Sequence, residues 1–451
     1  MNLAKTIAAQ PLSAALPDPR IAWQAARLRF ERRLPVHTKP EPASPMTIRR
    51  ARPGPVARIA RALTFAVLGR MRMGALVIEL PDGTERRFGG GAPGPAGRIR
   101  VRRHRFFTRL ASGGATGFGE SFVEGDWDTP DLTALIRVLA INRDHFAARA
   151  RWLGAPARAA GALLQRRRRN TRRGSLRNVQ AHYDQGNDFF RLFLDRSMTY
   201  SCAVYRESGE TLEAAQQRKL DAVLKKAQAG PDHHLLEIGS GWGSFALHAA
   251  RTTGCRVTGI TLSREQLALS RARAAEAGLA DRVRFQLCDY RDVRGRYDAI
   301  VSIEMLEAVG HEFLGAFFRR CDDLLKPGGR VVLQVITIDE RRYDAYRRSA
   351  DWIQKHVFPG GHLPSVEAMA RAMERHSGLV VRDLERIGEH YATTLRAWRE
   401  ALIRRRDEAL RLGADAGRIR EWTYYFCYCE AGFLEREIDD VQIVLGRAGE
   451  G

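Results

Sequence analysis

The chain has 451 residues, which is more than one compact hydrophobic core accommodates, so its length predicts two or three domains. Hydrophobic residues make up 44% and charged residues 28%, a composition that excludes a disordered or fibrous protein. The formal net charge of +22 predicts attraction to a polyanion, either nucleic acid or an anionic membrane surface, unless it merely reflects arginine-rich coding.

No stretch has the length of a membrane-spanning helix, and the N-terminus lacks the apolar core and cleavage site of a secretory signal. We therefore expect a cytoplasmic protein. The cysteines favour the same reducing compartment, because they follow neither a disulfide framework nor a metal-ligand spacing. They are Cys202, Cys255, Cys288, Cys321, Cys427 and Cys429.

The N-terminal part of the chain predicts two segments. Residues 1–60 are rich in alanine, proline and arginine, which indicates a flexible basic leader. Residues 61–142 predict a small α+β domain. Its expected elements are a strand from Ala75 to Leu80, a strand from Arg98 to Phe107, and a helix beginning near Pro130.

Residues 143–177 form a candidate linker with eleven arginines and one acid, Asp144. Such a charge run is usually a solvated linker. This one also carries apolar residues such as Trp152 and Leu163, and includes four consecutive arginines from Arg166 to Arg169. A basic segment with apolar side chains suits a membrane interface, so both interpretations stay open.

From residue 178 to 451 the chain alternates strands and helices, which predicts a doubly wound parallel sheet with its ligands beyond the carboxyl ends of the strands. Helices are expected at 264–276 and 312–325. The expected strands are 234–238, 256–261, 283–288, 298–303 and 329–337.

The most informative stretch runs from Leu235 to Gly243. An apolar strand ends in Glu237, and a glycine-rich turn leads directly into a helix. Glycines let the backbone turn sharply and approach a ligand closely. An acid followed by G-x-G-x-G, without a phosphate-binding lysine, favours S-adenosylmethionine over a nucleotide. The glycines are Gly239, Gly241 and Gly243.

Two further strand ends predict cofactor contacts. The second strand ends with the neutral hydrogen-bonding residues Thr261, Ser263 and Gln266, where an acid usually binds the ribose hydroxyls. Asp289 and Tyr290 follow the third strand, where an adenine edge would lie. Each residue alone could equally be a cap or a turn residue.

These motifs together resemble the cyclopropane-fatty-acyl-phospholipid synthase family, which uses S-adenosylmethionine and includes the mycolic acid cyclopropane synthases. The resemblance spans about residues 65–446 and implies a seven-stranded Rossmann-like methyltransferase domain after the α+β domain. Residues 117–132 resemble the lipid-handling N-terminal domain of longer members. The other matching motifs are His182-Tyr183-Asp184, Gly186-Asn187-Asp188-Phe189-Phe190, Thr199-Tyr200-Ser201-Cys202, 302–310, 358–365 and 390–395.

The resemblance also implies a chemistry. Methyl transfer to an alkene leaves a carbocation, and a bound bicarbonate would take one proton so that a ring can close. Its implied holders are Cys202 (through its backbone amide), Glu307, Ile336 and Tyr391, and the motif containing Tyr200 and Ser201 is implied to bind the cofactor. Glu307 also has an independent case, because it lies just past an apolar strand.

One position departs from the family pattern. Many members have a histidine where this chain has Gln334, and glutamine cannot carry charge or titrate. His390 is a candidate replacement. Cys429 lies in a motif whose cysteine has been considered for the active site, but buried packing is favoured over that role.

We therefore predict a cyclopropane-fatty-acyl-phospholipid synthase acting on unsaturated phospholipid at an anionic bilayer surface, with S-adenosylmethionine and bicarbonate and without a metal. Because of Gln334, a methyl-branched unsaturated chain is the alternative product. A nucleic-acid methyltransferase is disfavoured, because Ser302-Ile303-Glu304-Met305 is no base-recognition loop. The protein would bind the inner face of the membrane peripherally, and a homodimer would strengthen that binding.

Overall fold

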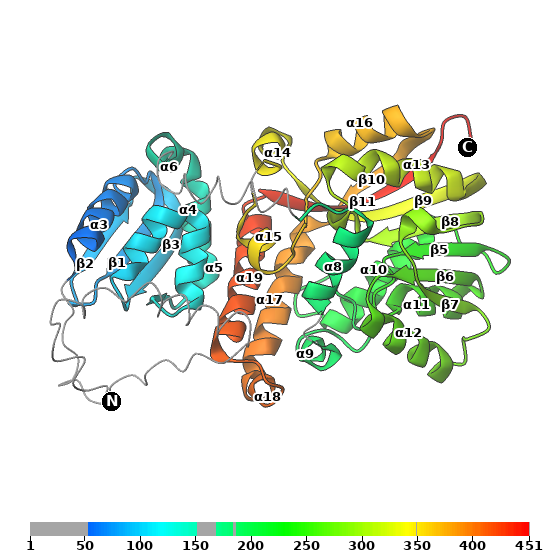
Figure 1. Ribbon diagram of the computed structural model, residues 1–451, viewed down its shortest axis with the longest axis horizontal. Coiled ribbons are helices and arrows are strands. Elements are labelled where there is room, and N and C mark those ends of the chain that lie inside the picture. Colours follow the sequence, from blue (N-terminus) through cyan, green and yellow to red (C-terminus); the bar gives the residue numbers. More distant parts are fainter. Residues whose placement is uncertain (1–52, 151–167, 184–185, 349, 451) are drawn as a thin grey trace, which may run out of the picture. The chain divides into compact units, whose positions relative to one another are not determined.

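The computed structural model describes residues 53–150, 168–183, 186–348 and 350–450, which contain two β-sheets (Figure 1). The smaller sheet has the strand order β2-β1-β3-β4, and the larger one has the order β10-β11-β9-β8-β5-β6-β7. The larger sheet confirms the predicted α/β fold. None of the helices in these described ranges combines the length and hydropathy needed to cross a membrane.

The smaller sheet and its helices are built from residues 55–150. The helix α3 begins at Pro55, inside the segment predicted as a leader, because proline is favoured in the first helical turn. Residues 1–52 of that leader lie outside the described residues. The elements are α3 (Pro55–Leu68), β1 (Met73–Glu79), β2 (Glu85–Gly89), β3 (Ala92–Val101), α4 (Arg105–Val123), β4 (Trp127–Asp128), α5 (Leu132–Ile141) and α6 (Arg143–Ala150).

The predicted strand from Arg98 to Phe107 is wrong at its end. β3 stops at Val101 and α4 begins at Arg105. The side chains of Phe106 and Phe107 are both buried. Successive residues of a strand face opposite sides of the sheet, so two adjacent buried aromatic residues fit a helix start inside the core better than a one-sided strand.

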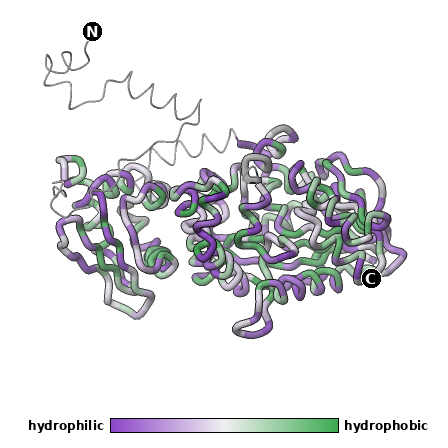
Figure 2. Tube along the Cα trace, turned by 90° about the horizontal axis from the view of Figure 1, so that it is seen from below, coloured by the Kyte–Doolittle hydropathy of each residue, from purple (hydrophilic) through white to green (hydrophobic). Residues whose placement is uncertain are grey.

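The larger sheet is doubly wound, with six strands running in one direction and the antiparallel β11 between β9 and β10. Its strands appear as hydrophobic segments inside the trace in Figure 2. Strands of a parallel sheet covered on both faces are apolar throughout, as the sequence predicted. They are β5 (His234–Ile238), β6 (Arg256–Thr261), β7 (Val283–Leu287), β8 (Tyr297–Ile303), β9 (Leu325–Ile338), β10 (Leu379–Arg386) and β11 (Ile438–Arg447).

Helices cover both faces of this sheet. Leu235 and Leu236 of β5 are neighbours in sequence but belong to two different hydrophobic clusters, one on each face. α10, α11 and α12 contribute to the cluster that contains Leu235, and α13 and α16 to the cluster that contains Leu236. These helices are α10 (Leu212–Ala227), α11 (Ser244–Thr253), α12 (Arg264–Glu276), α13 (Leu314–Leu324) and α16 (Val366–His376).

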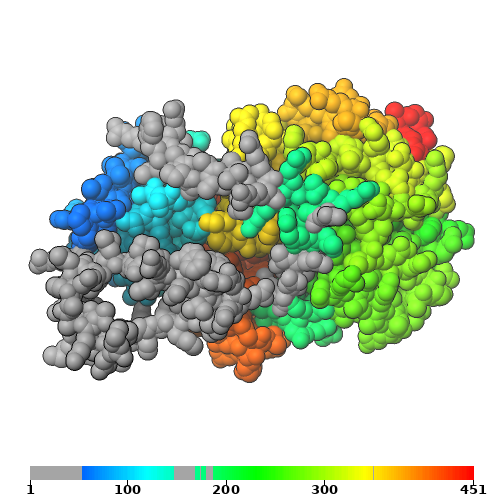
Figure 3. All heavy atoms as spheres, in the orientation of Figure 1, coloured from blue at the N-terminus to red at the C-terminus, as the bar shows by residue number. Residues whose placement is uncertain are grey.

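A third group of helices packs between the two sheets and shares an aromatic core with the smaller one. That core contains Trp127, Phe190, Trp398 and Trp422, all of them buried. The residues of α18 project at the lower edge of the molecule in Figure 3. The group comprises α8 (Arg172–Tyr183), α9 (Asn187–Arg191), α14 (Glu340–Tyr346), α15 (Trp352–His356), α17 (Gly388–Arg404), α18 (Arg406–Arg411) and α19 (Ala416–Leu434), and the short 3-10 turns are η3 (Tyr290–Asp292), η4 (Leu306–Ala308) and η5 (His311–Phe313).

Part of the candidate linker is bound to the protein. Arg168 donates hydrogen bonds to the carbonyl oxygens of Gln354 (2.9 Å) and Lys355 (3.0 Å), and Arg169 forms an ion pair with Glu312. Residues 151–167, with Arg166 and Arg167, lie outside the described residues. Two of the four consecutive arginines therefore have intramolecular partners, which favours a structural role for them.

A buried ion pair joins the two parts of the fold. Glu430 of α19 accepts hydrogen bonds from Thr133 of α5 (2.8 Å), Arg399 (2.5 Å) and Arg396 (3.0 Å). Glu430→Ala leaves the largely buried Arg399 guanidinium without its carboxylate, so we expect a loss of about 3–5 kcal/mol in the free energy of unfolding. Glu367→Ala, which breaks an exposed ion pair with Arg371, is the control and should change little. Equal melting temperatures for the two variants would contradict the structural role of Glu430.

Candidate functional site

One cavity of about 1190 Å³ extends from the carboxyl edge of the larger sheet, between the helices, to the smaller sheet. Thirteen of the residues predicted from the sequence line it, whereas Gly243, Ser263, Cys202 and Gln334 lie behind its wall. The lining residues are Tyr200, Ser201, Glu237, Gly239, Gly241, Thr261, Gln266, Asp289, Tyr290, Glu307, Ile336, Tyr391 and Cys429.

The glycine turn forms one end of the cavity. Gly239 directly follows β5 with φ +86°, and a Cβ there would lie 2.7 Å from Met305. Gly243 starts α11 away from the cavity, where a Cβ would meet Phe285 at 2.6 Å. The first of these glycines therefore lets the chain pass Met305 at the cavity wall, and the second lets the helix pack on the sheet.

Glu237 is the second-last residue of β5, beside this turn. Its side chain is buried, and its Oε2 has no hydrogen-bond partner among the described residues. Burial raises the pKa of this carboxyl to about 8, against the opposing charge of Lys219. An unpartnered carboxyl oxygen at the cavity wall is suited to a ligand that brings hydroxyl or amine donors, as S-adenosylmethionine does.

The neighbouring strand ends carry local hydrogen bonds. Thr261 donates to Gln266 Oε1 (2.8 Å), and Ser263 caps α12 by accepting from the Gln266 amide (3.2 Å). Burial raises the pKa of Asp289, but its hydrogen bonds with Arg291 outweigh this effect and lower it. Tyr290 packs against α13. Thr261, Gln266, Asp289 and Tyr290 thus offer polar atoms and a ring at an edge that fits the predicted cofactor.

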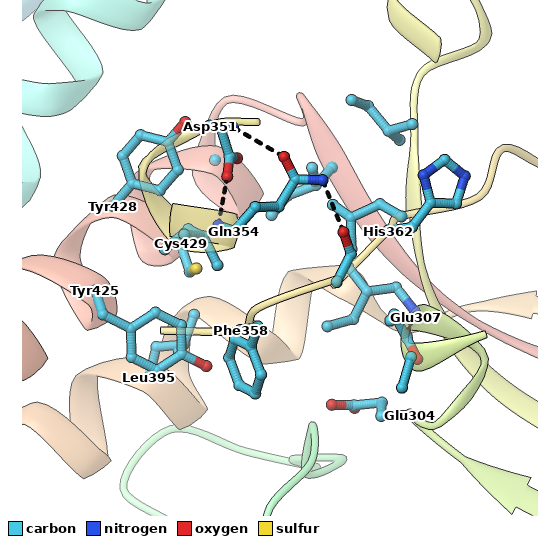
Figure 4. A pocket seen from close by; sticks show the side chains of 18 of the residues that line it. Glu304, Glu307, Asp351, Gln354, Phe358, His362, Leu395, Tyr425, Tyr428 and Cys429 are labelled. Carbon is cyan, nitrogen blue, oxygen red and sulfur yellow. Dashed lines mark hydrogen bonds between the residues drawn. The ribbon is translucent and has the colours of Figure 1, made fainter. Parts of the chain in front are cut away.

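A pair of carboxyl groups lies beyond the cofactor end, on the segment that follows β8 (Figure 4). Glu304 accepts hydrogen bonds on Oε1 from the Cys202 amide (2.7 Å) and the Gln334 side chain (2.8 Å). Its Oε2 accepts from the Tyr391 hydroxyl (2.6 Å). The sequence analysis missed Glu304 as a site residue, although an acid just past a parallel strand was the available signal.

Glu307 stands next to it on η4. Its Oε1 accepts from the Ile336 amide (2.5 Å), while its Oε2 has no partner among the described residues. Desolvation, followed by repulsion from Glu304, raises the pKa of Glu307 to about 8. The Glu307 carboxyl is therefore mainly protonated at neutral pH.

The expected bicarbonate site does not fit this arrangement. The Cys202 amide and the Tyr391 hydroxyl already donate to Glu304, and the Ile336 amide already donates to Glu307. A second anion at these donors would meet two carboxyl groups. The resemblance predicted the donors without revealing that side chains of this chain occupy them.

Gln334 is buried behind Glu304 and links it to a second acid. Its amide nitrogen donates to Glu304 and to Asp440 Oδ2 (2.9 Å), and its oxygen accepts from Gln442 (3.1 Å). Burial and repulsion from Glu304 raise the pKa of Asp440 well above its usual range. A neutral amide with two hydrogens suits a position between two carboxyl groups.

Lys219 of α10 is a buried cation near these acids. It donates to the Ser201 hydroxyl (2.6 Å). Burial lowers its pKa, while attraction to Glu304 opposes this effect. No sequence motif indicated Lys219 or Asp440, because each enters the cluster from an element distant in the chain.

The other predicted residues, Cys202, Cys429 and His390, provide no ionised or titrating side chain at the carboxyl pair. The Cys202 thiol faces backbone carbonyls, including that of Ala203 (3.3 Å), and burial raises its pKa, so it is no thiolate. Burial also raises the pKa of Cys429, which does line the cavity. His390 lies beside Tyr205, at 6.4 Å between ring centroids, and is not part of the cavity wall, so it cannot replace the missing histidine.

Beyond the carboxyl groups the cavity is mostly apolar, although Arg143, Arg342 and Glu437 also line it. Phe358, Leu395 and Tyr425 form one wall in Figure 4, and residues of the smaller sheet and its helices form the far end. Asp351 and Gln354, also in this view, hold each other in a capping box at the start of α15. The far-end residues include Leu76, Ile78, Phe106, Phe118 and Ile136. An elongated apolar chain fits this space better than a polar substrate does.

Comparisons with known proteins agree with these features. A family model described as mycolic acid cyclopropane synthetase matches residues 170–443. Tuberculostearic acid methyltransferase UfaA1 of Mycobacterium tuberculosis is 39% identical over 405 residues, which is 88% of this chain and 93% of that protein. Cyclopropane-fatty-acyl-phospholipid synthase of Escherichia coli K12 is 35% identical over 358 residues, covering 78% and 88%. The crystal structure of mycolic acid cyclopropane synthase CmaA1 complexed with SAH and CTAB has a TM-score of 0.56 at 33% identity, covering 60% of this chain and 97% of that one.

The glycine turn can be tested by Gly239→Ala. The added methyl group would clash with Met305 and would also disfavour the positive φ, so we expect S-adenosylmethionine binding at least about tenfold weaker by calorimetry. Gly278→Ala is the matched control, because Gly278 has φ +65° with open space around its Cβ position. Equal affinity in the two variants would contradict a requirement for glycine at position 239.

Glu307 predicts a pH-dependent stability. The folded protein keeps this proton up to about pH 8, whereas the unfolded chain releases it near pH 4.5, the ordinary pKa of a glutamate side chain. The free energy of unfolding therefore falls as pH rises through this window. The Glu307→Gln side chain cannot ionise. The melting temperature of this variant minus that of the wild type should therefore increase from pH 5.5 to pH 8. The same melting-temperature difference at both pH values would contradict the raised pKa of Glu307.

Proposed function

Because the chain belongs to the mycolic acid cyclopropane synthetase family of S-adenosylmethionine-dependent methyltransferases, we propose that it methylates the cis double bond of an unsaturated phospholipid acyl chain. The observation that carries this proposal is the single cavity in which a glycine turn, a pair of carboxyl groups and a long apolar space follow one another. Cofactor, reacting carbons and acyl chain can lie in that order.

The proposed cofactor contacts are those of the residues at the glycine turn and at the ends of β6 and β7. Glu237 and Gln266 offer polar atoms, while Gly239 allows close approach. The bound cofactor supplies an electrophilic methyl group on a sulfonium. The chain itself orients this methyl group toward the apolar space and excludes water from it.

The carboxyl groups serve the reaction electrostatically. Addition of a methyl cation to an alkene leaves a positive charge on the acyl chain, in surroundings that offer it little solvation. The Glu304 carboxylate is fixed by three donors before the reaction begins, so it can offset this charge without reorganising. The apolar walls keep water from trapping the cation.

Two products can form from the same cation. Cyclopropane ring closure is the product predicted from the sequence. Methyl-branched unsaturated chains are the second candidate, favoured by Gln334 in place of a histidine. Relatives named for each chemistry support both, since UfaA1 is a tuberculostearic acid methyltransferase and the Escherichia coli relative is a cyclopropane synthase. Bicarbonate takes no part in the proposed reaction, because the carboxyl groups of Glu304 and Glu307 already occupy the donors expected to bind it.

Binding at an anionic bilayer surface is part of the proposal. The net charge of +22 supports it. So does α3, on which Val56, Ile59 and Leu63 are 71%, 64% and 48% exposed, with Arg58 and Arg61 between them. Apolar side chains flanked by arginines suit peripheral contact with phospholipid at the inner face of the membrane. A homodimer stays a prediction.

The proposed function is tested by incubating the protein with S-adenosylmethionine and vesicles of cis-monounsaturated phospholipid. We expect fatty acids one CH₂ heavier by gas chromatography–mass spectrometry. A product that resists mild hydrogenation is a cyclopropane, and one that takes up hydrogen is a methyl-branched alkene. Saturated phospholipid is the control. No lipid product from protein that binds the cofactor would overturn the proposal.

A further inference from the structure

We propose that Glu304 is the proton acceptor of the reaction, its carboxylate occupying the set of donors formed by the Cys202 amide, the Tyr391 hydroxyl and the Gln334 amide. The inference rests on the proposed methyl transfer, which requires one proton to leave the methylated chain. It makes the acceptor a part of the polypeptide, so no dissolved anion is needed.

The hydrogen bonds identify Glu304 as the ionised carboxyl of the cluster. Every group bound to it is a donor, and the two oxygens accept three hydrogen bonds of 2.6–2.8 Å between them. The Gln334 amide has no freedom to turn its oxygen toward Glu304, because that oxygen accepts from Gln442. A carboxylate is the form that accepts from all three.

Neighbouring acids are less suited to the role. Glu307 carries an unpartnered Oε2 and holds a proton at neutral pH, and Asp440 does not line the cavity. Desolvation raises the pKa of Glu304, although hydrogen bonds from Tyr391 and the Cys202 amide and the charge of Lys219 oppose this effect. A carboxylate that is more basic than usual, and that faces the reacting space, suits proton transfer.

The backbone of Glu304 adopts an energetically unfavourable conformation that holds the side chain in this position. Glu304 has φ +50°, a conformation that a residue with a Cβ rarely adopts, and its amide donates to the Gln334 carbonyl (2.8 Å). Such strain persists where the surroundings require it, and it often marks functional positions. Glycine would adopt this conformation freely, which provides a variant that removes the carboxylate without disturbing the turn.

The proton balance is simple. The π electrons of the alkene form the new C–C bond to the methyl group, the electron pair of the broken C–S bond stays on sulfur, and the adjacent chain carbon becomes a cation. A C–H bond then breaks, and its electron pair either closes the cyclopropane ring or forms a new C=C bond. The proton goes to the Glu304 carboxylate, which becomes a neutral acid and must lose that proton to water before the next turnover.

The first test uses the wild-type protein in buffer freed of carbon dioxide. With a built-in acceptor, we expect the rate of lipid methylation to be unchanged when bicarbonate is added back. A rate that falls on removal of carbon dioxide and returns with bicarbonate would overturn the proposal. This test does not depend on the folding of any variant.

The second test removes the carboxylate. Glu304→Gln keeps the size of the side chain but cannot accept the proton, so we expect kcat to fall at least about 100-fold while the affinity for S-adenosylmethionine is kept. Glu304→Gly should be equally slow, but it leaves the three donors free. Added bicarbonate or formate should then restore its rate at least about tenfold, an effect that a merely structural role would not produce.

The control is Glu367→Gln, which alters an exposed acid paired with Arg371 and should keep both rate and indifference to added anions. Full activity of Glu304→Gly without an added anion would overturn the proposal, as would its failure to respond to either anion while it still binds the cofactor. Absence of lipid product from the wild type would instead contradict the proposed function, so the two failures are distinguishable.

Discussion

The structure depends on how several acidic side chains are accommodated at the carboxyl edge of the larger sheet. Glu237, Glu304, Glu307 and Asp440 meet there in surroundings that raise the pKa of each. Burying a carboxylate without donors is costly, so only the acid with enough donors can stay ionised. Three donors at Glu304, against one at Glu307, divide the two neighbouring carboxyl groups into an anion and a neutral acid.

That division fits the chemistry of a cationic cofactor and a cationic intermediate. A fixed negative charge beside an apolar cavity stabilises positive charge more strongly than it would in water, because little solvent screens it. The protons held by Glu237 and Glu307 limit the total charge that the fold must bury. Lys219 opposes part of what remains, from the side of the cluster that faces α10.

The cavity joins this polar cluster to a space of a different kind. Its far end belongs to the smaller sheet, whose helices pack on α19 through Thr133, Glu430 and Arg399. The same interface that holds the two sheets together therefore also shapes the apolar part of the site. The polar cluster and the apolar space therefore share one continuous cavity wall.

The sequence by itself determined the fold class, the order of the strands along the chain and the glycine turn, because these follow from local patterns of apolar, small and capping residues. Helix α12 begins and ends at the predicted residues, Arg264 and Glu276. The predicted end of β3 was wrong because the mixed basic and apolar sequence from Arg98 to Phe107 does not show where the strand ends and the buried helix begins. The donors Cys202 and Tyr391 were identified by a motif comparison, whereas Glu304 lay inside a matching motif that did not reveal it as their acceptor.

Only the tertiary structure decided which groups meet. Glu304, Gln334, Asp440 and Lys219 come from four elements separated by tens to hundreds of residues, and no local pattern records that they converge. Whether an acid is ionised depends on the number of donors that the fold brings to it, which is a property of three-dimensional packing. The sequence therefore specified a methyltransferase sheet with a cofactor turn, and the packing of distant side chains decided which carboxylate serves its site.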